Sequence, residues 1–400
     1  MNKMDEKAKT PSIRFAGFTD AWELRKLGDC FDERQERSSE GELISVTINS
    51  GIKKFEELKR HDTSSNDKSH YKRVEVGDIA YNSMRMWQGA SGYSPFRGIL
   101  SPAYTVVIPK DGVSSLFFSY MFKCDGMVHT FQIRSQGITS DTWNLKYPAF
   151  SEIGTAVPSL SEQNKIATFL GNLDRHIALQ QRKHDKLVNL KKSMLEKMFP
   201  QHGADVPEIR FAGFTGAWER RTVGNVTEEI NHYATFQSGF PLLTSSRTGL
   251  MFQHEYRDNT STKNQDILFS VVPMGACTYR HMSDDDVFHF NINELVENGL
   301  VSREYPVFVS SIGNNLSTVI LYLNSSPKFK AFCREQKMGG TRTRLYYKNL
   351  CAFQLLLPTE KEQIKIAYFF KCLDTLITLH QRKLTKLQNI KNSCLEKIFV

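Results

Sequence analysis

A helix-forming segment occurs twice in this chain, at residues 158–200 and 358–400. When the two copies are aligned without a gap, about half of the paired positions are identical, which indicates an internal duplication. In both copies apolar residues recur at alternating spacings of three and four, which predicts a helix with one apolar seam. At about 1.5 Å per residue each helix would be about 60 Å long, which favours a spacer over an element of a compact core. The predicted seam comprises Leu173, Ile177, Gln180 and Leu187 in the first copy and Leu373, Ile377, His380 and Leu387 in the second.

Two polar residues, Gln180 and His380, occupy equivalent points of the two seams. A polar pair buried between the helices would fix their register. A seam that faces water and a partner subunit is the alternative, and the sequence leaves both interpretations open.

A second duplicated motif opens each half of the chain. Residues 11–29 read PSIRFAGFTDAWELRKLGD, and residues 207–225 read PEIRFAGFTGAWERRTVGN. The order of short motif, variable segment and long helix therefore occurs twice. The predicted parts are a flexible tail (1–10), a first domain (11–157), a first long helix (158–200), a linker (201–206), a second domain (207–357) and a second long helix (358–400).

The variable segments within the two domains share landmarks although they differ in most residues. GILSPAYTVV at 98–107 parallels GLVSREYPVF at 299–308, and both read as strands rich in β-branched and aromatic residues. The predicted fold class is therefore α/β (α+β). Two similar mixed α/β domains are separated by two long helices that form an antiparallel coiled coil with a pseudo-twofold internal repeat.

The charge of the chain favours a polyanionic partner. Its formal net charge is +9, although solubility alone would also account for this value. The seven cysteines contain no C-x-x-C pair, which argues against a metal site or structural disulfides and fits a reducing compartment. No apolar run reaches the length of a membrane span, so we expect a cytoplasmic protein without membrane contact.

Sequence motifs for catalysis are absent. There is no G-x-x-x-x-G-K-[ST] phosphate loop, no glycine-rich dinucleotide fingerprint and no H-E-x-x-H pair. The run Asp284-Asp285-Asp286 favours an acidic turn over a metal site. We therefore predict no catalytic residue, metal or cofactor in this chain.

The whole chain resembles the specificity subunits of type I restriction–modification systems. The resemblance rests on the IRFAGFT-x-AWE motifs at 13–23 and 209–219 and on the Pro-x-x-x-Glu-Gln-x-Lys-Ile-Ala starts at 158–167 and 358–367. The LEK-x-F ends of both long segments add to it, and YNSMRMWQGASG at 81–92 is similar to a core sequence of one type of target recognition domain.

The resemblance implies that each variable segment is a target recognition domain that reads one half of a split, asymmetric site in double-stranded DNA. The helices would set the gap between the halves and dock two methyltransferase subunits. Two restriction (motor) subunits would join the full complex. Adenine methylation and ATP-dependent restriction would then belong to partners that hold S-adenosylmethionine, ATP and Mg. The alternatives are a coiled-coil scaffold with two protein-binding domains and a self-contained nuclease or methyltransferase.

Candidate DNA contacts in the first domain lie in three loops. Lysine and arginine suit phosphates and guanine, whereas asparagine and glutamine suit adenine. The basic residues of the first loop would also fit a solvated loop, and Trp87 fits a core residue better than a base contact. The candidates are Lys53, Lys54, Arg60, Lys72 and Arg73, then Asn82, Arg85 and Gln88, and finally Arg134, Gln136 and Thr139.

In the second domain the strongest candidate loop is 337–344, KMGGTRTR. Its glycines permit close approach of the backbone, and the alternation of Arg342 and Arg344 puts them on one side of a strand. The candidates are Lys337, Thr341, Arg342, Thr343 and Arg344, with Arg280 as a further contact.

The arginines of the duplicated motif, Arg14 and Arg210, are expected to be structural and to pack near Trp22 and Trp218. If they read bases, both half-sites would share a base.

Overall fold

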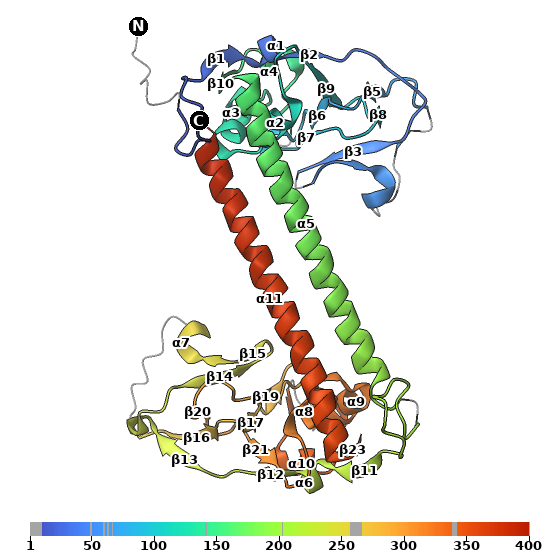
Figure 1. The fold of residues 1–400 in the computed structure, drawn as a ribbon, viewed down its shortest axis with the longest axis vertical. Helices are drawn as coiled ribbons and strands as arrows, with labels where there is room; N and C mark the ends of the chain where they lie inside the picture. Colours follow the sequence, from blue (N-terminus) through green and yellow to red (C-terminus); the bar gives the residue numbers. More distant parts are fainter. Residues whose placement is uncertain are drawn as a thin grey trace. The chain divides into compact units, whose positions relative to one another are not determined.

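The computed structural model describes residues 10–48, 50–58, 61, 64–65, 67–140, 142–201, 203–256, 266–337 and 342–399. The chain divides into two compact units: unit 1 is residues 1–182 and 381–400, and unit 2 is residues 183–380. Each unit contains one globular domain and parts of both long helices, α5 (Leu160–Lys197) and α11 (Glu360–Ile398) (Figure 1). Both helices begin two residues after the starts predicted from the sequence.

The two helices lie antiparallel within each unit. In unit 1 Lys391 Nζ donates to Asp174 Oδ1 (2.5 Å), and residues 394–399 of the C-terminal end pack into the same buried cluster as the start of α5. In unit 2 the equivalent Lys191 Nζ donates to Asp374 Oδ1, again at 2.5 Å. Because equivalent side chains make equivalent contacts in both units, the structure confirms the internal repeat and the antiparallel pairing.

The eight predicted seam residues differ in burial. Leu173, Leu373 and Gln180 are buried, and the other members, Ile177, Leu187, Ile377, His380 and Leu387, are half-buried. The role of Gln180 and His380 in helix register stays a prediction.

The globular domain of unit 1 is built from short antiparallel strands and small helices. A four-stranded sheet has the order β2-β9-β6-β7, and three pairs, β1-β10, β3-β4 and β5-β8, surround it. The strands are β1 (Glu23–Lys26), β2 (Phe31–Glu33), β3 (Ile44–Thr47), β4 (Gly51–Lys54), β5 (Lys72–Val74), β6 (Ile79–Asn82), β7 (Ser91–Tyr93), β8 (Gly98–Leu100), β9 (Tyr104–Pro109) and β10 (Gly154–Val157). The helices are α1 (Leu27–Cys30), η2 (Phe55–Leu58), η3 (Met86–Gln88), α2 (Ser115–Met121), α3 (Asp125–Arg134) and α4 (Tyr147–Ser151).

Unit 2 repeats this topology. The sheet β12-β21-β17-β19 corresponds to the four-stranded sheet of unit 1, and the pair β11-β23 corresponds to β1-β10. Its remaining sheets are β13-β16-β20, β14-β15 and β18-β22. The strands are β11 (Glu219–Thr222), β12 (Thr227–Glu229), β13 (Tyr233–Thr235), β14 (Leu243–Ser246), β15 (Gly249–Phe252), β16 (Leu268–Pro273), β17 (Cys277–Thr278), β18 (Met282–Ser283), β19 (Asn291–Ile292), β20 (Asn298–Ser302), β21 (Val307–Ser310), β22 (Thr343–Arg344) and β23 (Gln354–Leu357). The helices are α6 (Val223–Val226), η4 (Phe236–Ser238), α7 (Gln253–Tyr256), α8 (Leu316–Ser325), α9 (Pro327–Glu335) and α10 (Tyr347–Leu350). The predicted mixed α/β fold is confirmed.

The hydrophobic core of each domain includes an aromatic residue from the end of one long helix. That helix begins in the other repeat. In unit 1 Phe399, at the end of α11, packs against Phe117 with the ring centroids 5.3 Å apart. In unit 2 Phe199, after α5, packs edge-on against Trp218 at 5.9 Å. The end of each long helix is therefore part of the hydrophobic core of a domain.

The duplicated motif fixes the start of a long helix in each unit. Arg14 Nε and Nη2 donate to the two carboxylate oxygens of Glu162, both at 2.7 Å. Arg210 makes the same bidentate contact with Glu362, with both distances again 2.7 Å. Both carboxylates are buried, so these arginines are structural, and they act through an ion pair with the helix.

Among the described residues, no helix combines the length and the apolarity needed to cross a membrane. Nor do the described residues contain a group of three or more His, Cys, Asp or Glu side chains that could hold a metal ion.

Candidate nucleic-acid interface

In unit 1 the loop after β6 meets the loop that precedes α4. The backbone N–H of Leu145 donates to the Ser83 carbonyl oxygen (2.8 Å). The rings of Trp87 and Trp143 pack edge to face with their centroids 5.3 Å apart, and Trp87 Nε1 donates to the Met84 carbonyl oxygen. The two loops that the sequence singled out are therefore neighbours, and Trp87 lies half-buried between them.

A cleft of about 920 Å³ opens beside these loops, and three predicted contacts line it. Asn82 is half-buried at the end of β6, whereas Arg85 is exposed and donates from Nη1 to Gln88 Oε1 at 3.3 Å. Amide and guanidinium groups on one wall provide both donors and acceptors for base edges. Other lining residues are Ile44 and Ser45 of β3, Tyr71, Tyr104, Trp87 and Ser140.

The predicted loop after α3 is closed by its own backbone. Gln136 and Asn144 exchange two backbone hydrogen bonds of 3.0 and 2.8 Å, and Thr142 Oγ1 accepts from the Thr139 N–H. The side chains of Arg134, Gln136 and Thr139 are exposed. This loop lies next to the cleft, since Ser140 lines that cleft.

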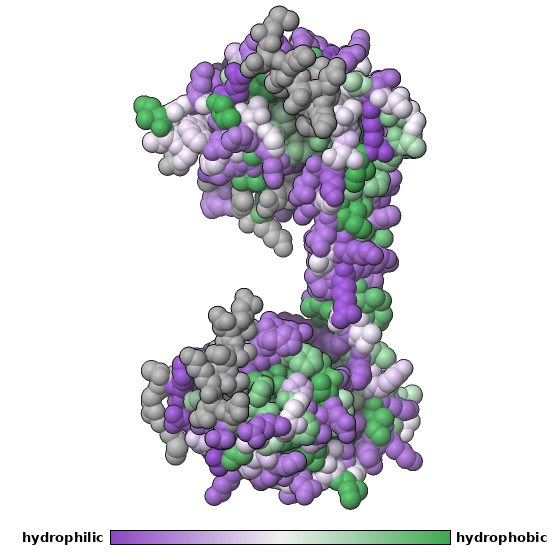
Figure 2. Space-filling model, turned by 90° about the vertical axis from the view of Figure 1, so that its left-hand side faces the viewer, coloured by the Kyte–Doolittle hydropathy of each residue, from purple (hydrophilic) through white to green (hydrophobic). Residues whose placement is uncertain are grey.

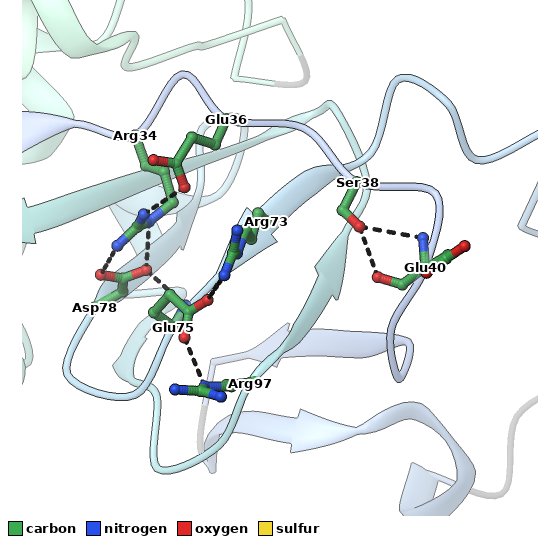
Figure 3. A network of polar contacts seen from close by, with 8 residues as sticks. All are labelled: Arg34, Glu36, Ser38, Glu40, Arg73, Glu75, Asp78 and Arg97. Carbon is green, nitrogen blue, oxygen red and sulfur yellow. Dashed lines mark hydrogen bonds and ion pairs between the residues drawn. The ribbon is translucent and has the colours of Figure 1, made fainter.

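The predicted basic residues of the first domain are largely paired with carboxylates. Lys54 Nζ lies 2.8 Å from Glu42, and Figure 3 shows Arg73 directed toward Glu75, which Arg97 also contacts. Lys53 contacts Glu57 at 3.6 Å, Lys72 contacts Glu33 at 3.2 Å, and Arg60 lies outside the described residues. Ion pairs at the surface contribute at most about 1 kcal/mol, so a phosphate could replace the carboxylate of the more exposed pairs, Lys53–Glu57 and Arg73–Glu75, at little cost.

The β3-β4 hairpin forms a further wall of the cleft and is held by a lysine. Lys123 Nζ donates to the carbonyl oxygens of Ile48, in the hairpin turn (2.7 Å), and of Gly89, after η3. Burial lowers the pKa of Lys123 to about 8. Gly92 permits the hairpin to lie on β7, because a Cβ there would be 2.8 Å from Gly51 Cα. The hairpin and the loop after β6 are therefore fixed relative to each other.

Unit 2 uses the same backbone frame with different side chains. The Leu345 N–H donates to the His281 carbonyl oxygen (2.8 Å), which matches the Leu145–Ser83 contact of unit 1. The loop after β17 and the loop before α10 then pair as β18 and β22. This frame exposes Arg280, Arg342 and Arg344 on the second domain, and Lys337 is also exposed.

One predicted contact in this loop is buried. Thr343 is fully buried and its Oγ1 donates to Asp286 Oδ1, so the prediction of a DNA contact by Thr343 is wrong. The alternation that exposes Arg342 and Arg344 turns the residue between them inward. Thr341 lies outside the described residues.

The acidic run of unit 2 is an acidic turn that contacts the candidate Arg342 and also Arg247. Asp284 Oδ1 accepts from Arg342 Nε at 2.7 Å, and Asp285 lies 2.8 Å from Nη2 of Arg247 in the β14-β15 turn. The hydrogen bond from the Ser283 hydroxyl holds the pKa of Asp285 below its ordinary value, and the charge of Arg247 adds to this effect. Sequence reasoning missed this contact between aspartates and arginines, because the partners are far apart along the chain.

Hydrophilic residues cover much of the surface shown in Figure 2, and hydrophobic residues form small separate groups. The cleft beside the loop after β6 is lined by both polar and apolar residues, among them Asn82, Arg85, Tyr71 and Trp87. Its polar groups suit a hydrated, charged ligand.

The sequence matches the family described as "Type I restriction modification DNA specificity domain" over residues 19–189 and 237–389. Among solved structures, the fold is similar to that of the S subunit of a type-I restriction-modification system from M. genitalium. The TM-score is 0.62 at 14% identity, over 98% of this chain and 99% of that chain. The HsdS subunit from Thermoanaerobacter tengcongensis gives a TM-score of 0.43 at 16% identity, over 94% and 96% of the two chains. No curated protein gives a significant sequence match.

Proposed function

Because this chain belongs to the type I restriction-modification DNA specificity family, we propose that its two globular domains read the two halves of a split, asymmetric DNA target. The family is non-catalytic, and the chain is the DNA specificity component of such a system.

The observation that best supports two DNA-reading surfaces is that both domains hold their loops in the same way. The Leu145–Ser83 and Leu345–His281 hydrogen bonds hold equivalent pairs of loops at the same place in each repeat. The backbone frame is shared, while the exposed side chains on it differ between the two domains. A duplicated frame that carries different polar side chains suits two unlike half-sites.

Base reading in the first domain is assigned to the cleft residues Asn82, Arg85 and Gln88, with Gln136 and Thr139 on the adjacent loop. Arg342, Arg344 and Arg280 take this role in the second domain, since arginine pairs bidentately with guanine. The remaining basic candidates, which are exposed or half-buried, are assigned to phosphates, which set position and affinity but carry no sequence information. These are Lys53, Lys54, Lys72, Arg73, Arg134 and Lys337.

The helices α5 and α11 are proposed to set the gap and to dock two methyltransferase subunits, with two restriction subunits in the full complex. Adenine methylation and ATP-dependent restriction then take place on partners that hold S-adenosylmethionine, ATP and Mg. The exposed leucines at equivalent points of the two helices, Leu179 and Leu379, are consistent with two similar docking surfaces.

Base-resolution methylation mapping tests this function. Cells would express this chain with its cognate methyltransferase subunit, and control cells would express the methyltransferase subunit alone. We expect one new motif that consists of two short, unlike halves around a fixed gap. A stable complex that adds no methylation would contradict the proposal and favour a scaffold role.

Replacing Arg342 or Arg344 by Ala is expected to weaken recognition of one half-site by about 1–3 kcal/mol, because each would lose a bidentate contact with guanine. Competition binding of the methyltransferase complex with duplexes altered at single positions measures this loss. Arg221→Ala is the matched control, since Arg221 is an exposed arginine of unit 2 paired with Glu219 on β11. An equal loss on every DNA sequence would instead identify a phosphate contact.

A further inference from the structure

The turn after β18 brings three consecutive carboxylates to the candidate interface of unit 2. Asp284 accepts from Arg342, Asp285 is paired with Arg247, and Asp286 accepts from the buried Thr343. Free carboxylates would repel DNA phosphates at such a surface. Two of the three are instead paired with arginines, so the turn adds little net negative charge.

The turn is held rigidly by contacts that do not involve the arginines. The Ser283 hydroxyl donates to Asp285 Oδ1 (2.8 Å) and accepts from the Val287 N–H (3.1 Å). Asp286 is the only non-glycine residue with a left-handed φ (61°) in the part of the chain that the structure describes. A rigid turn gives the Asp284 carboxylate a defined position from which to hold a flexible partner.

The ion pair between Asp284 and Arg342 is too exposed to contribute much to folding. The two side chains are 59% and 54% exposed, and ion pairs at such exposure have small effects on stability. The contact is made through Arg342 Nε. That geometry occupies the Nε edge of the guanidinium, and neither Nη1 nor Nη2 donates a hydrogen bond to the described residues, so the outer edge of the fork that matches guanine O6 and N7 stays available.

We propose that Asp284 is a positioning residue: it holds Arg342 by Nε so that Nη1 and Nη2 read a guanine in the half-site bound by unit 2. This inference rests on the proposed function. Fixing the side chain before binding reduces the rotamer entropy that an arginine loses when it makes a directed contact.

Unit 1 has a neutral counterpart of this arrangement. Arg85 lies on the loop after β6, which corresponds to the loop that carries Asp284, and Gln88 Oε1 accepts from its Nη1 at 3.3 Å. That contact is longer, its acceptor is a neutral amide in place of a carboxylate, and it occupies one arm of the fork. We therefore expect a sharper preference for guanine at the position read by Arg342 than at the position read by Arg85.

The test compares the full chain and its Asp284→Asn, Arg342→Ala and doubly substituted variants, each assembled with the cognate methyltransferase subunit. A library of random duplex DNA is bound and sequenced for each complex. Glu219→Gln is the matched control, because Glu219 forms an exposed pair with Arg221 of unit 2 away from these loops. The half-site of unit 1 is an internal control for folding and assembly, because the same chain reads it.

We expect Asp284→Asn to reduce the guanine preference at one position about tenfold, with unchanged or slightly stronger binding to unrelated DNA, because one negative charge is lost. Arg342→Ala should affect the same position, and the double variant should be no worse than Arg342→Ala alone. An unchanged preference in Asp284→Asn, or an equal loss on all sequences, would overturn the positioning role while leaving the proposed function intact. If the unsubstituted complex selects no split sequence, the proposed function itself fails, and this inference fails with it.

Discussion

Replacing Arg14 by Ala is expected to destabilise unit 1 by about 3 kcal/mol, the lower end of the range of about 3–5 kcal/mol for a broken buried ion pair. The Glu162 carboxylate is 1% exposed and accepts two hydrogen bonds from Arg14, so truncation of Arg14 leaves a buried charge without its partner. Glu162 also lies in the first turn of α5, where the helix dipole offsets about 1 kcal/mol of that cost.

Denaturant unfolding followed by circular dichroism measures the loss, and hydrogen exchange with mass spectrometry locates it. Faster exchange should appear in peptides of unit 1 and be absent from most of unit 2. Arg210→Ala is the matched variant, since Arg210 and Glu362 make the same contact in unit 2. Its faster exchange should appear in peptides of unit 2 and be absent from most of unit 1.

A second substitution, at Glu162, distinguishes the cost of an unpaired charge from the cost of lost packing. Arg14→Ala combined with Glu162→Gln replaces the buried carboxylate by a neutral amide, so we expect it to recover a substantial part of the stability. Arg14→Lys keeps the charge but loses the planar fork, so its stability should lie between the stabilities of Arg14→Ala and of the double variant. A loss below about 1 kcal/mol for Arg14→Ala would mean that the pair behaves like an exposed one.

The long-range architecture was predictable because it is encoded by repetition and periodicity. Two copies of one apolar pattern predicted the two long helices, and the shared strands at 98–107 and 299–308 correspond to β8-β9 and β20-β21. The pairing of Arg14 with Glu162 could also have been inferred, because both repeats carry the same arginine and the same glutamate.

The details of the candidate interfaces were harder to predict because they depend on contacts between distant residues. Nothing local links Asp284 to Arg342, which are brought together only when β18 pairs with β22. The pairing of Lys54 with Glu42 likewise requires the β3-β4 hairpin to have formed. The burial of Thr343, by contrast, follows from the same alternation that exposes its two arginine neighbours.

Lengthening both long helices by four residues is expected to widen the gap in the methylated motif by one to two base pairs. Four helical residues add about 6 Å, and one turn of DNA rises about 34 Å over about ten base pairs. The insertions belong after Gln180 and after His380, between the Asp174–Lys391 and Lys191–Asp374 contacts, so that both ion pairs and both domain cores stay intact. Each half-site should keep its sequence.

Methylation of the original target should fall by about a thousandfold or more, because a misplaced domain loses several base contacts of about 1–3 kcal/mol each. Methylation mapping with the lengthened chain measures both the loss and the new motif. An insertion in α5 alone is the control: it moves Lys191 relative to Asp374 and should lower the yield of the assembled complex without producing a new gap. Paired insertions that leave the gap unchanged would show that the helices hold the domains without setting the gap between the half-sites. The partner subunits would then have to set that gap.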